Sequence, residues 1–332
     1  MKILVIGGTR FLGRHFVEAA LKNNHEVTVF HRGQTNVGLF DDVEEILGDR
    51  DGGTDRLKGR EWDAVVDTCG YVPRVVRQSV EALAGTTANY TFISSISVYK
   101  DFPEAGMDET TPVDVLPEDD ADSEDVSKYY GPLKALCEYE VTRGFGERAL
   151  IVRPGLIVGP NDPTDRFTYW PARFDQGGDA LVPGDAERLI QFIDVRDLAS
   201  FTLALVEQGA GGVYHATGLP VSMAELVEAC QAASVHAAAP VWVEESFLEG
   251  TDVQPWMELP LWIGPAANWP GFMEVSVAKA LERGLTCRST LETVRDTLSW
   301  VKTGRGDREW KAGLRPEKER ELLNAWRASQ SS

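Results

Sequence analysis

The sequence lacks the features that mark a secreted, metal-binding or membrane protein. Its four cysteines lie far apart and show no paired spacing of a zinc site or a redox dithiol, so no metal site is expected. No apolar run approaches the length that spans a bilayer. Met1 and Lys2 lead directly into the apolar stretch 3–6, without the charged segment and cleavage site of a secretory signal. We expect a cytoplasmic protein with reduced cysteines and no membrane contact.

Basic charge is also scarce. Lys and Arg total 33 against 52 Asp and Glu, which gives a net charge of −19. A surface of this sign repels a phosphate backbone at long range. A nucleic-acid partner is therefore disfavoured, and a small-molecule substrate is the expected partner.

Short apolar runs are plentiful and alternate with amphipathic stretches in the first half of the chain. The chain has 332 residues, 43% of them hydrophobic, which is too long for one ordinary compact domain without a second lobe. The predicted strands are 2–6, 26–30, 43–47, 64–67, 90–94 and 150–152, and the helical spacing of apolar residues predicts a helix over 11–23. The alternation predicts an α/β fold with a doubly wound parallel sheet and a smaller C-terminal substrate lobe.

After Pro154 the pattern changes to connections rich in Gly, Pro and Trp around short elements. We expect a strand at 192–194 and helices at 197–206 and 222–232, the second capped by Ser222 with Glu225 three residues on. The acidic segment 107–125 predicts a solvated loop. The expected division is 1–154 for the first domain, with 189–215 returning to it, 155–188 and 216–303 for the substrate lobe, and 304–332 for a charged helical tail.

Glycines cluster directly after the first predicted strand, where the chain reads Gly7-Gly8-Thr9-Arg10-Phe11-Leu12-Gly13. Glycines at this place permit a tight turn, close approach of the backbone to a pyrophosphate, and close packing of helix on strand. A tight turn without a ligand is the alternative, which the flanking strand and helix disfavour. The pattern predicts a dinucleotide-binding Rossmann domain.

With this loop the chain resembles the extended short-chain dehydrogenases/reductases, of the NAD(P)-dependent epimerase/dehydratase type. Their usual loop is Gly-Gly-x-Gly-x-x-Gly, and in this chain Arg10 occupies the position of the middle glycine. The resemblance continues through Arg153-Pro154-Gly155, Gly159-Pro160 and 192–199, and becomes loose beyond about residue 206. It implies further cofactor contacts, which are expected at Asp49, Arg50, Cys69, Gly70 and Pro154.

The end of the second predicted strand bears on the choice of cofactor. It reads His31-Arg32-Gly33, where an NAD-specific enzyme would normally place an acid for the ribose hydroxyls. Arg10 and Arg32 could instead pair with a 2′-phosphate. We expect NADP in preference to NAD, with His31 and Arg32 at the cofactor; a solvated Arg32 is the alternative.

Tyr130 and Lys134 form a Tyr-x-x-x-Lys pair after the fifth predicted strand. On a helix this spacing places both side chains on one face, so that an ammonium can favour ionisation of a phenol. Tyr129 has no lysine four residues on. Because Gly131 and Pro132 lie inside the pair, we expect the helix to start near Pro132, with Tyr130 at its mouth.

The segment 92–99 resembles the strand end that carries the family's catalytic serine, which matches Ser95; Ser94 and Ser97 are secondary candidates, and turn chemistry is the alternative. The resemblance implies hydride transfer between a nicotinamide and a carbon bearing a hydroxyl or carbonyl. Tyr130 would then exchange the proton, Ser95 would orient the oxygen, and Lys134 would lower the pKa of Tyr130 and hold the nicotinamide ribose.

The substrate is less defined. Arg166, Arg173 and Arg188 fall in segments that line the substrate lobe of nucleotide-sugar members, and Arg166, Arg188 and Ser97 are the substrate candidates. Solvated arginines are the alternative. The tryptophans between 241 and 273 predict packing of the second lobe, or else an aromatic lid over an apolar substrate.

Three functional alternatives stay open. Carbonyl reduction and sugar epimerisation are not separated, whereas dehydration is disfavoured because Ile96 and Ser97, not acids, follow Ser95. The stretch Gly-Gly-Thr-Arg-Phe also resembles plastid RNA-binding relatives, so a non-catalytic nucleotide-binding or RNA-binding protein is the second reading. The family's habit of pairing through helices of the first domain implies a homodimer.

Overall fold

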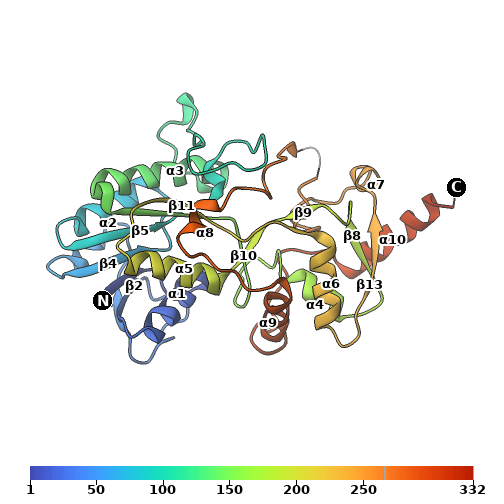
Figure 1. Ribbon diagram of the computed structural model, residues 1–332, viewed down its shortest axis with the longest axis horizontal. Coiled ribbons are helices and arrows are strands. Elements are labelled where there is room, and N and C mark those ends of the chain that lie inside the picture. Colours follow the sequence, from blue (N-terminus) through green and yellow to red (C-terminus); the bar gives the residue numbers. More distant parts are fainter. Residues whose placement is uncertain (265–266, 332) are drawn as a thin grey trace.

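Seven parallel strands form the central sheet of the amino-terminal half, in the order β11-β6-β5-β4-β1-β2-β3 (Figure 1). The structure is a computed structural model and describes residues 1–264 and 267–331. The strands are β1 (Lys2–Ile6), β2 (Glu26–His31), β3 (Glu44–Leu47), β4 (Trp62–Asp67), β5 (Thr87–Ile93), β6 (Ala149–Pro154) and β11 (Gly212–Ala216). The predicted doubly wound parallel sheet is confirmed, and the first six strands lie where the sequence predicts them.

Helices cover both faces of this sheet. α1 (Phe11–Lys22) packs against α5 (Val195–Glu207) on one face, and α2 (Pro73–Leu83) packs against α3 (Val126–Phe145) on the other. Side chains alternate along a strand, so Ile3 and Val5 enter the core with α1 and α5, whereas Leu4 and Ile6 enter the core with α2 and α3. Burial on both faces explains why β1 is a continuous apolar run.

The edge strand β11 is not predicted by the apolar pattern. It contains His215, which is fully buried. The ring nitrogens of His215 lie 2.6 Å from the hydroxyl of Tyr99 and 2.9 Å from the carbonyl oxygen of Ser276. Such partners allow a polar side chain into a core, but periodicity alone cannot reveal them.

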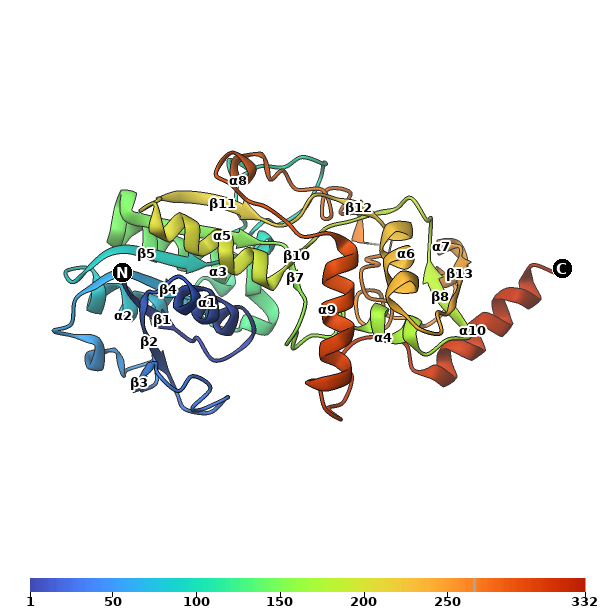
Figure 2. The same cartoon turned by 60° about the horizontal axis from the view of Figure 1, so that its bottom comes forward.

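The second lobe has its own core, built on β8 (Asp179–Pro183) and β13 (Ala239–Val243), which pair in parallel. Its main helices are α4 (Tyr169–Asp175), α6 (Met223–Ala233), α9 (Thr290–Thr303) and α10 (Pro316–Ser329). The smaller elements between and within the lobes are β7 (Leu156–Val158), β9 (Leu189–Ile190), β10 (Phe192–Asp194), β12 (Val221–Ser222) and α7 (Glu245–Glu249). α8 (Ala278–Glu282) packs against β11 of the central sheet. The amino-terminal half also contains the 3₁₀ helices η1 (Thr54–Leu57), η2 (Ile96–Val98), η3 (Glu118–Asp120) and η4 (Gly146–Arg148). The two lobes lie at opposite ends of an elongated molecule (Figure 2).

Several local predictions for the second half are confirmed. The strand 192–194 is β10, and Ser222 caps α6 by accepting the amide of Glu225 at 3.1 Å. The carboxylate of Glu225 does not bond back to the cap and instead accepts the hydroxyl of Thr290 at 2.5 Å. The segment 107–125 is irregular apart from η3. None of the described helices is long and apolar enough to cross a lipid bilayer.

The helix that carries Tyr130 is predicted to start near Pro132, and the structure agrees with this only in part. α3 begins at Val126, because the carboxylate of Asp125 accepts the amides of Ser127 and the next residue and caps it. Pro132 disturbs the helix one turn earlier, where the backbone of Tyr129 is non-helical (φ −124°, ψ 36°). Tyr130 therefore follows the kink and begins the longer part of α3, as expected, but a capped helical turn at 126–128 precedes it.

Candidate active site

A cavity of about 680 Å³ opens at the carboxyl ends of the central strands, where ligands bind in doubly wound folds. The expected cofactor and catalytic residues that line it are Gly7, Gly8, Thr9, Arg10, Phe11, Leu12, Gly13, His31, Arg32, Asp49, Arg50, Cys69, Ser95, Tyr130, Lys134 and Pro154. Ser94 lines it as well. Gly70, Ser97, Arg166 and Arg188 are not in its lining. Most of the predicted residues are therefore brought together in one place.

The glycine loop has no room for side chains at its key positions. Gly7 and Gly8 have φ of +104° and +88°, a region that favours glycine. A Cβ at Gly7 would lie 2.3 Å from the hydroxyl oxygen of Thr68, and one at Gly13 would lie 2.7 Å from the amide nitrogen of Gly8. Arg10 has an extended backbone (φ −136°), which any residue can adopt, so the missing middle glycine causes no strain there.

The first turn of α1 is open to an anion. Arg10 is the N-cap residue but makes no side-chain cap, and the first turn carries no acid. The amides of such a turn lack intrahelical partners and point toward the space before the helix. Together with the positive end of the helix dipole, they offer a site for a phosphate.

Two cationic side chains lie near this turn, Arg10 at the N-cap of α1 and Arg32 directly after β2. Arg10 and Arg32 are exposed on the cavity, and neither forms a hydrogen bond or ion pair in the part of the chain that the structure describes. The neighbouring His31 is buried, and its Nδ1 accepts the amide of Gly33 at 3.0 Å. Residues 31–33 contain no acid, although the carboxylate of Glu45 on β3 lies 3.6 Å from Nε2 of His31.

Asp49 and Arg50 follow β3 and differ in orientation. The carboxylate of Asp49 accepts the amide of Asp51 at 3.0 Å. The guanidinium of Arg50 turns instead to the buried carboxylate of Asp67, with nitrogen–oxygen distances of 2.7 and 2.6 Å. Burial raises the pKa of the Cys69 thiol beside this pair, so Cys69 is a neutral side chain.

Lys134 is buried on α3, with 3% of its surface exposed. Its Nζ donates to the carbonyl oxygens of Gly70 at 2.8 Å and Ile93 at 2.6 Å. Burial lowers the pKa of Lys134 to about 8. The lysine therefore joins the ends of β4 and β5 and has one N–H donor left.

Tyr130 meets Ser95 at the cavity. Burial raises the pKa of Tyr130, and the hydrogen bond with Ser95 works against that rise. The sequence predicts that Lys134 lowers this pKa; in the chain alone the largest effect on it is burial, which raises it. Ser95 also caps η2, accepting the amide of Ser97 at 3.0 Å. The neighbouring Tyr129 instead donates its hydroxyl to Asp120.

Two residues that shape this site do not stand out in the sequence. A Cβ at Gly131 would lie 2.1 Å from the carbonyl oxygen of Ser97, so only glycine lets α3 approach η2 this closely. Tyr71 lies beside Tyr130, with ring centroids 6.4 Å apart. Asp67 also shapes the site and is not predicted to do so. An acid at the end of an apolar strand could have indicated it.

Of the substrate candidates, Ser97 lies in η2 of the amino-terminal half, and the arginines lie in the second lobe. Arg188 donates to the carbonyl oxygen of Leu261 at 2.6 Å, while its Nε and one Nη are buried without a partner in the described residues. Burial lowers the pKa of Arg188 to about 10 and lowers that of Arg166. Arg166 lies 5.4 Å from the ring centre of Trp256. Arg173 differs, because it pairs with the buried Glu319 at 2.7 Å.

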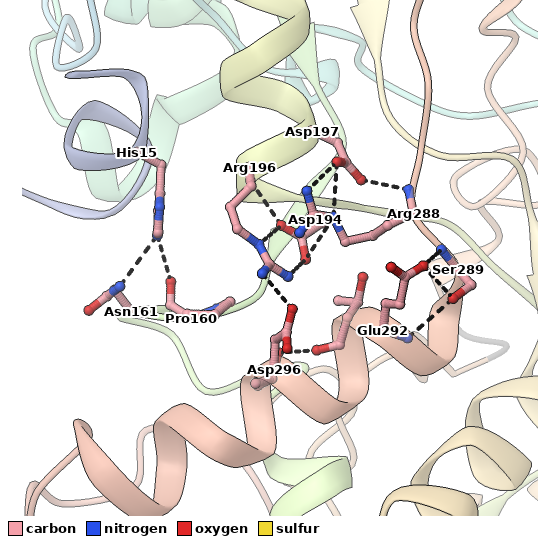
Figure 3. Close-up of polar contacts among 12 residues, drawn as sticks. His15, Pro160, Asn161, Asp194, Arg196, Asp197, Arg288, Ser289, Glu292 and Asp296 are labelled. Carbon is pink, nitrogen blue, oxygen red and sulfur yellow. Dashed lines mark hydrogen bonds and ion pairs between the residues drawn. The ribbon is translucent and has the colours of Figure 1, made fainter. Parts of the chain in front are cut away.

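Polar contacts join the two lobes beside the cavity (Figure 3). The ring of His15 on α1 lies 3.1 Å from the carbonyl oxygen of Pro160. Arg196, at the start of α5, reaches Asp296 on α9 at 2.5 Å, and Arg288 pairs with Asp197 at 2.7 Å. These contacts fix the second lobe against α1 and α5. The described residues contain no cluster of His, Cys, Asp or Glu that could hold a metal ion.

Comparisons with known proteins bear on this site. Among curated relatives, the chain is similar to the chloroplast stem-loop binding protein of 41 kDa b of Arabidopsis thaliana, with 27% identity over 249 residues, covering 69% of this chain and 62% of that protein. It is also similar to dTDP-4-dehydro-6-deoxy-D-allose reductase of Streptomyces bikiniensis, with 36% identity over 89 residues, or 25% and 26% of the two chains. The chain thus spans less than two thirds of the length of these curated relatives.

Solved structures share the fold. UDP-glucuronic acid 4-epimerase from Bacillus cereus, in complex with NAD, superposes with a TM-score of 0.67 at 18% identity, covering 94% of this chain and 100% of that one. The profile of the NAD dependent epimerase/dehydratase family matches residues 3–216, well over half of the chain. The resemblance to the extended short-chain dehydrogenases is thereby confirmed, and the chain belongs to the NAD dependent epimerase/dehydratase family.

Proposed function

We propose that the chain is an oxidoreductase or epimerase that transfers hydride at a carbon bearing a hydroxyl or carbonyl group, with Tyr130 as its acid or base. The observation that carries this proposal is that Ser95, Tyr130 and Lys134 lie on the same cavity as the glycine loop. Tyr130 and Ser95 interact with each other and both line the cavity, so one substrate oxygen could meet both.

The residues present fit a nicotinamide dinucleotide. The uncapped first turn of α1 suits a pyrophosphate, and the crowding at Gly7 and Gly13 indicates a loop shaped for close backbone approach. Lys134 keeps one donor for a ligand in the cavity. When bound, the nicotinamide would supply the hydride acceptor and donor.

The chain's own residues handle the proton. A tyrosine whose pKa is raised by burial is protonated at neutral pH, so Tyr130 is suited to donate its proton to a carbonyl oxygen. Ser95 would donate a hydrogen bond to the same oxygen and stabilise its developing negative charge. Lys134, with a pKa of about 8, is mostly charged at neutral pH and adds a positive potential near that oxygen.

For the cofactor, we propose NADP. Support comes from Arg10 and Arg32, which are free of protein partners in the described residues and lie on the cavity. Two guanidinium groups suit a 2′-phosphate, which the carboxylate typical of NAD-specific enzymes would repel.

For the substrate, we propose a molecule that carries phosphate, such as a sugar nucleotide. Arg166 and Arg188 are partly buried, lack a carboxylate partner in the described residues and keep buried nitrogens without hydrogen bonds. An anionic ligand would satisfy them. The Bacillus cereus neighbour, solved with UDP-glucuronic acid and NAD, shows that this fold can hold such a substrate.

A turnover experiment tests the proposal. Purified protein is incubated with NADPH or NADH and a panel of simple ketones, UDP-glucose and UDP-glucuronic acid, while cofactor oxidation and sugar epimers are monitored. We expect Tyr130→Phe to lower turnover by roughly a thousandfold, because it removes the acid, and to leave NADPH affinity nearly unchanged. Tyr129→Phe is the matched control, since its hydroxyl donates to Asp120. Full activity in Tyr130→Phe would defeat the assignment.

An RNA-binding role is the second candidate, favoured by the similarity to the Arabidopsis stem-loop binding protein. The net charge of −19 opposes it. A gel-shift assay with an RNA stem-loop at increasing salt separates the two candidates: a tight, salt-sensitive shift, with no binding of either coenzyme, would favour RNA.

A further inference from the structure

The carboxyl end of β4 holds a fully buried carboxylate, Asp67, that the proposed reaction does not use. Two of its bonds come from Arg50, at 2.7 and 2.6 Å. The hydroxyl of Tyr90 donates at 2.9 Å and the amide of Cys69 at 3.1 Å. A buried carboxylate with a bidentate guanidinium and two further donors has a well-defined position.

Arg50 connects the carboxylate of Asp67 to a part of the cavity wall that is distant in the sheet. It lies in the loop after β3, and in the sheet β3 is separated from β4 by β2 and β1. The same guanidinium donates to the hydroxyl of Ser79 on α2 at 3.2 Å. The ion pair therefore ties the loop that carries Asp49 to the turn that follows β4.

The turn after β4 leads directly to Lys134. Asp67 fixes the amide of Cys69, and the carbonyl of the next residue, Gly70, accepts from Nζ of Lys134 at 2.8 Å. The turn has little room to shift, because a Cβ at Gly70 would lie 2.5 Å from the ring of Phe92. A displacement of Asp67 would therefore be passed on to Lys134.

We propose that Asp67, held by Arg50, is a positioning residue for the reaction proposed above: it fixes the turn at residues 68–70 and thereby seats Lys134 and shapes the cofactor cavity. This inference rests on the proposed function. It also gives Arg50 a role different from the direct cofactor contact that the family resemblance implies.

The charge of Asp67 acts on the pKa of Lys134, an effect that a purely structural ion pair far from the site would not have. The groups that face Lys134 are the thiol of Cys137, the carboxylates of Asp67 and Glu138, the guanidinium of Arg50, and the rings of Tyr71 and Phe92. Burial lowers the pKa of Lys134 to about 8, while Asp67 raises it and Arg50 lowers it. Neutralising Asp67 alone must lower that pKa further, and neutralising both partners must leave it nearly unchanged.

The experiment follows Lys134 by NMR titration of its ε-methylene group in the full chain without cofactor, and measures NADPH affinity by fluorescence. In Asp67→Asn we expect the midpoint of Lys134 to fall by roughly half a pH unit or more. NADPH affinity should fall roughly tenfold, because the turn is no longer held. The double variant Asp67→Asn/Arg50→Gln removes both charges, so no unpaired cation stays buried. It should restore the midpoint but not the affinity.

Tyr90→Phe is the matched control, because it removes one hydrogen bond from Asp67 and keeps the ion pair. It should lower the melting temperature while leaving both readouts near native. Three results would overturn the positioning role. The double variant could bind NADPH with native affinity, the midpoint of Lys134 could stay unchanged in Asp67→Asn, or Tyr90→Phe could lose as much NADPH affinity as Asp67→Asn. If the native protein binds neither coenzyme, the proposed function fails, yet the titration still reports whether Asp67 acts on Lys134.

Discussion

Gly131 shows how the absence of a side chain can bring two reactive groups together. The residue sits directly after Tyr130 on α3, and its Cα faces the carbonyl of Ser97 in the turn that Ser95 caps. Glycine inside a helix costs about 1 kcal/mol relative to alanine. Here the close approach outweighs that cost, because it sets the distance between the phenol and the serine.

We therefore expect Gly131→Ala to reduce turnover by about a hundredfold, although alanine is the better helix former. The new Cβ would lie 2.1 Å from the carbonyl oxygen of Ser97, so α3 or η2 must move. The turnover assay and NADPH affinity are measured together, and only turnover should fall sharply. Gly85→Ala is the control, since a Cβ there meets nothing within 4 Å. Unchanged turnover in Gly131→Ala would show that the approach is not needed.

Some site residues could be predicted from the sequence and others could not. Tyr130 and Lys134 have a fixed spacing on one helix, and the glycine loop follows the first strand directly, so both signals are local. The roles of Gly131 and Asp67 depend on contacts with Ser97 and Arg50, which come from other segments. Only the folded chain shows those contacts.

At the level of elements, burial decides what the sequence reveals. β1, β2, β4, β5 and β6 contribute buried residues to the cores on both faces of the sheet, and their apolar residues identify them, whereas the edge strand β3 is only half-buried. In the second lobe, β13 contains Pro240 and pairs with β8, some 60 residues earlier in the chain, which a local pattern cannot indicate. The first turn of α3, before the kink, is not predicted for a similar reason, because the cap at Asp125 lies in a segment whose acidic composition suggests only a loop.

The C-terminal segment is tied into the second lobe by a buried acid. Asp165 is fully buried and has a φ of +63°. Its carboxylate pairs with Arg305 at 3.2 Å and Arg308 at 2.6 Å, and it accepts the amide of Lys311 at 3.1 Å. The loop that holds Asp165 also contributes Pro163 to the cavity. The segment after α9 therefore supports a wall of the site.

We expect Arg305→Ala to destabilise the fold by about 3 kcal/mol, because it removes one partner of a buried carboxylate. Thermal and urea unfolding measure this loss. Arg320→Ala on α10 is the matched control, since that arginine is exposed and forms no ion pair among the described residues. A change of less than about 1 kcal/mol in Arg305→Ala would show that Arg308 and the amide of Lys311 suffice for Asp165.

At the scale of the whole molecule, the charge distribution makes the cavity unusual. The chain carries a net charge of −19, yet Arg10 and Arg32 stand unpaired on the cavity in the described residues. Other arginines near the surface are neutralised by carboxylates, as Arg74 is by Asp51 and Glu124. A local positive potential at the cavity would attract an anionic cofactor against the overall field.

This contrast gives a test of cofactor choice. We expect the native protein to bind NADPH more tightly than NADH, with the NADPH affinity falling more steeply as salt is raised, because the 2′-phosphate adds charge. Arg32→Asp should weaken NADPH binding at least tenfold and leave NADH binding unchanged or improved, because a carboxylate repels the 2′-phosphate and can accept a ribose hydroxyl. Lys22→Asp makes the same change in net charge at the far end of α1 and should leave the ratio of the two affinities as in the native protein. Equal affinities for both coenzymes, unmoved by Arg32→Asp, would contradict the NADP preference while leaving the dinucleotide site itself intact.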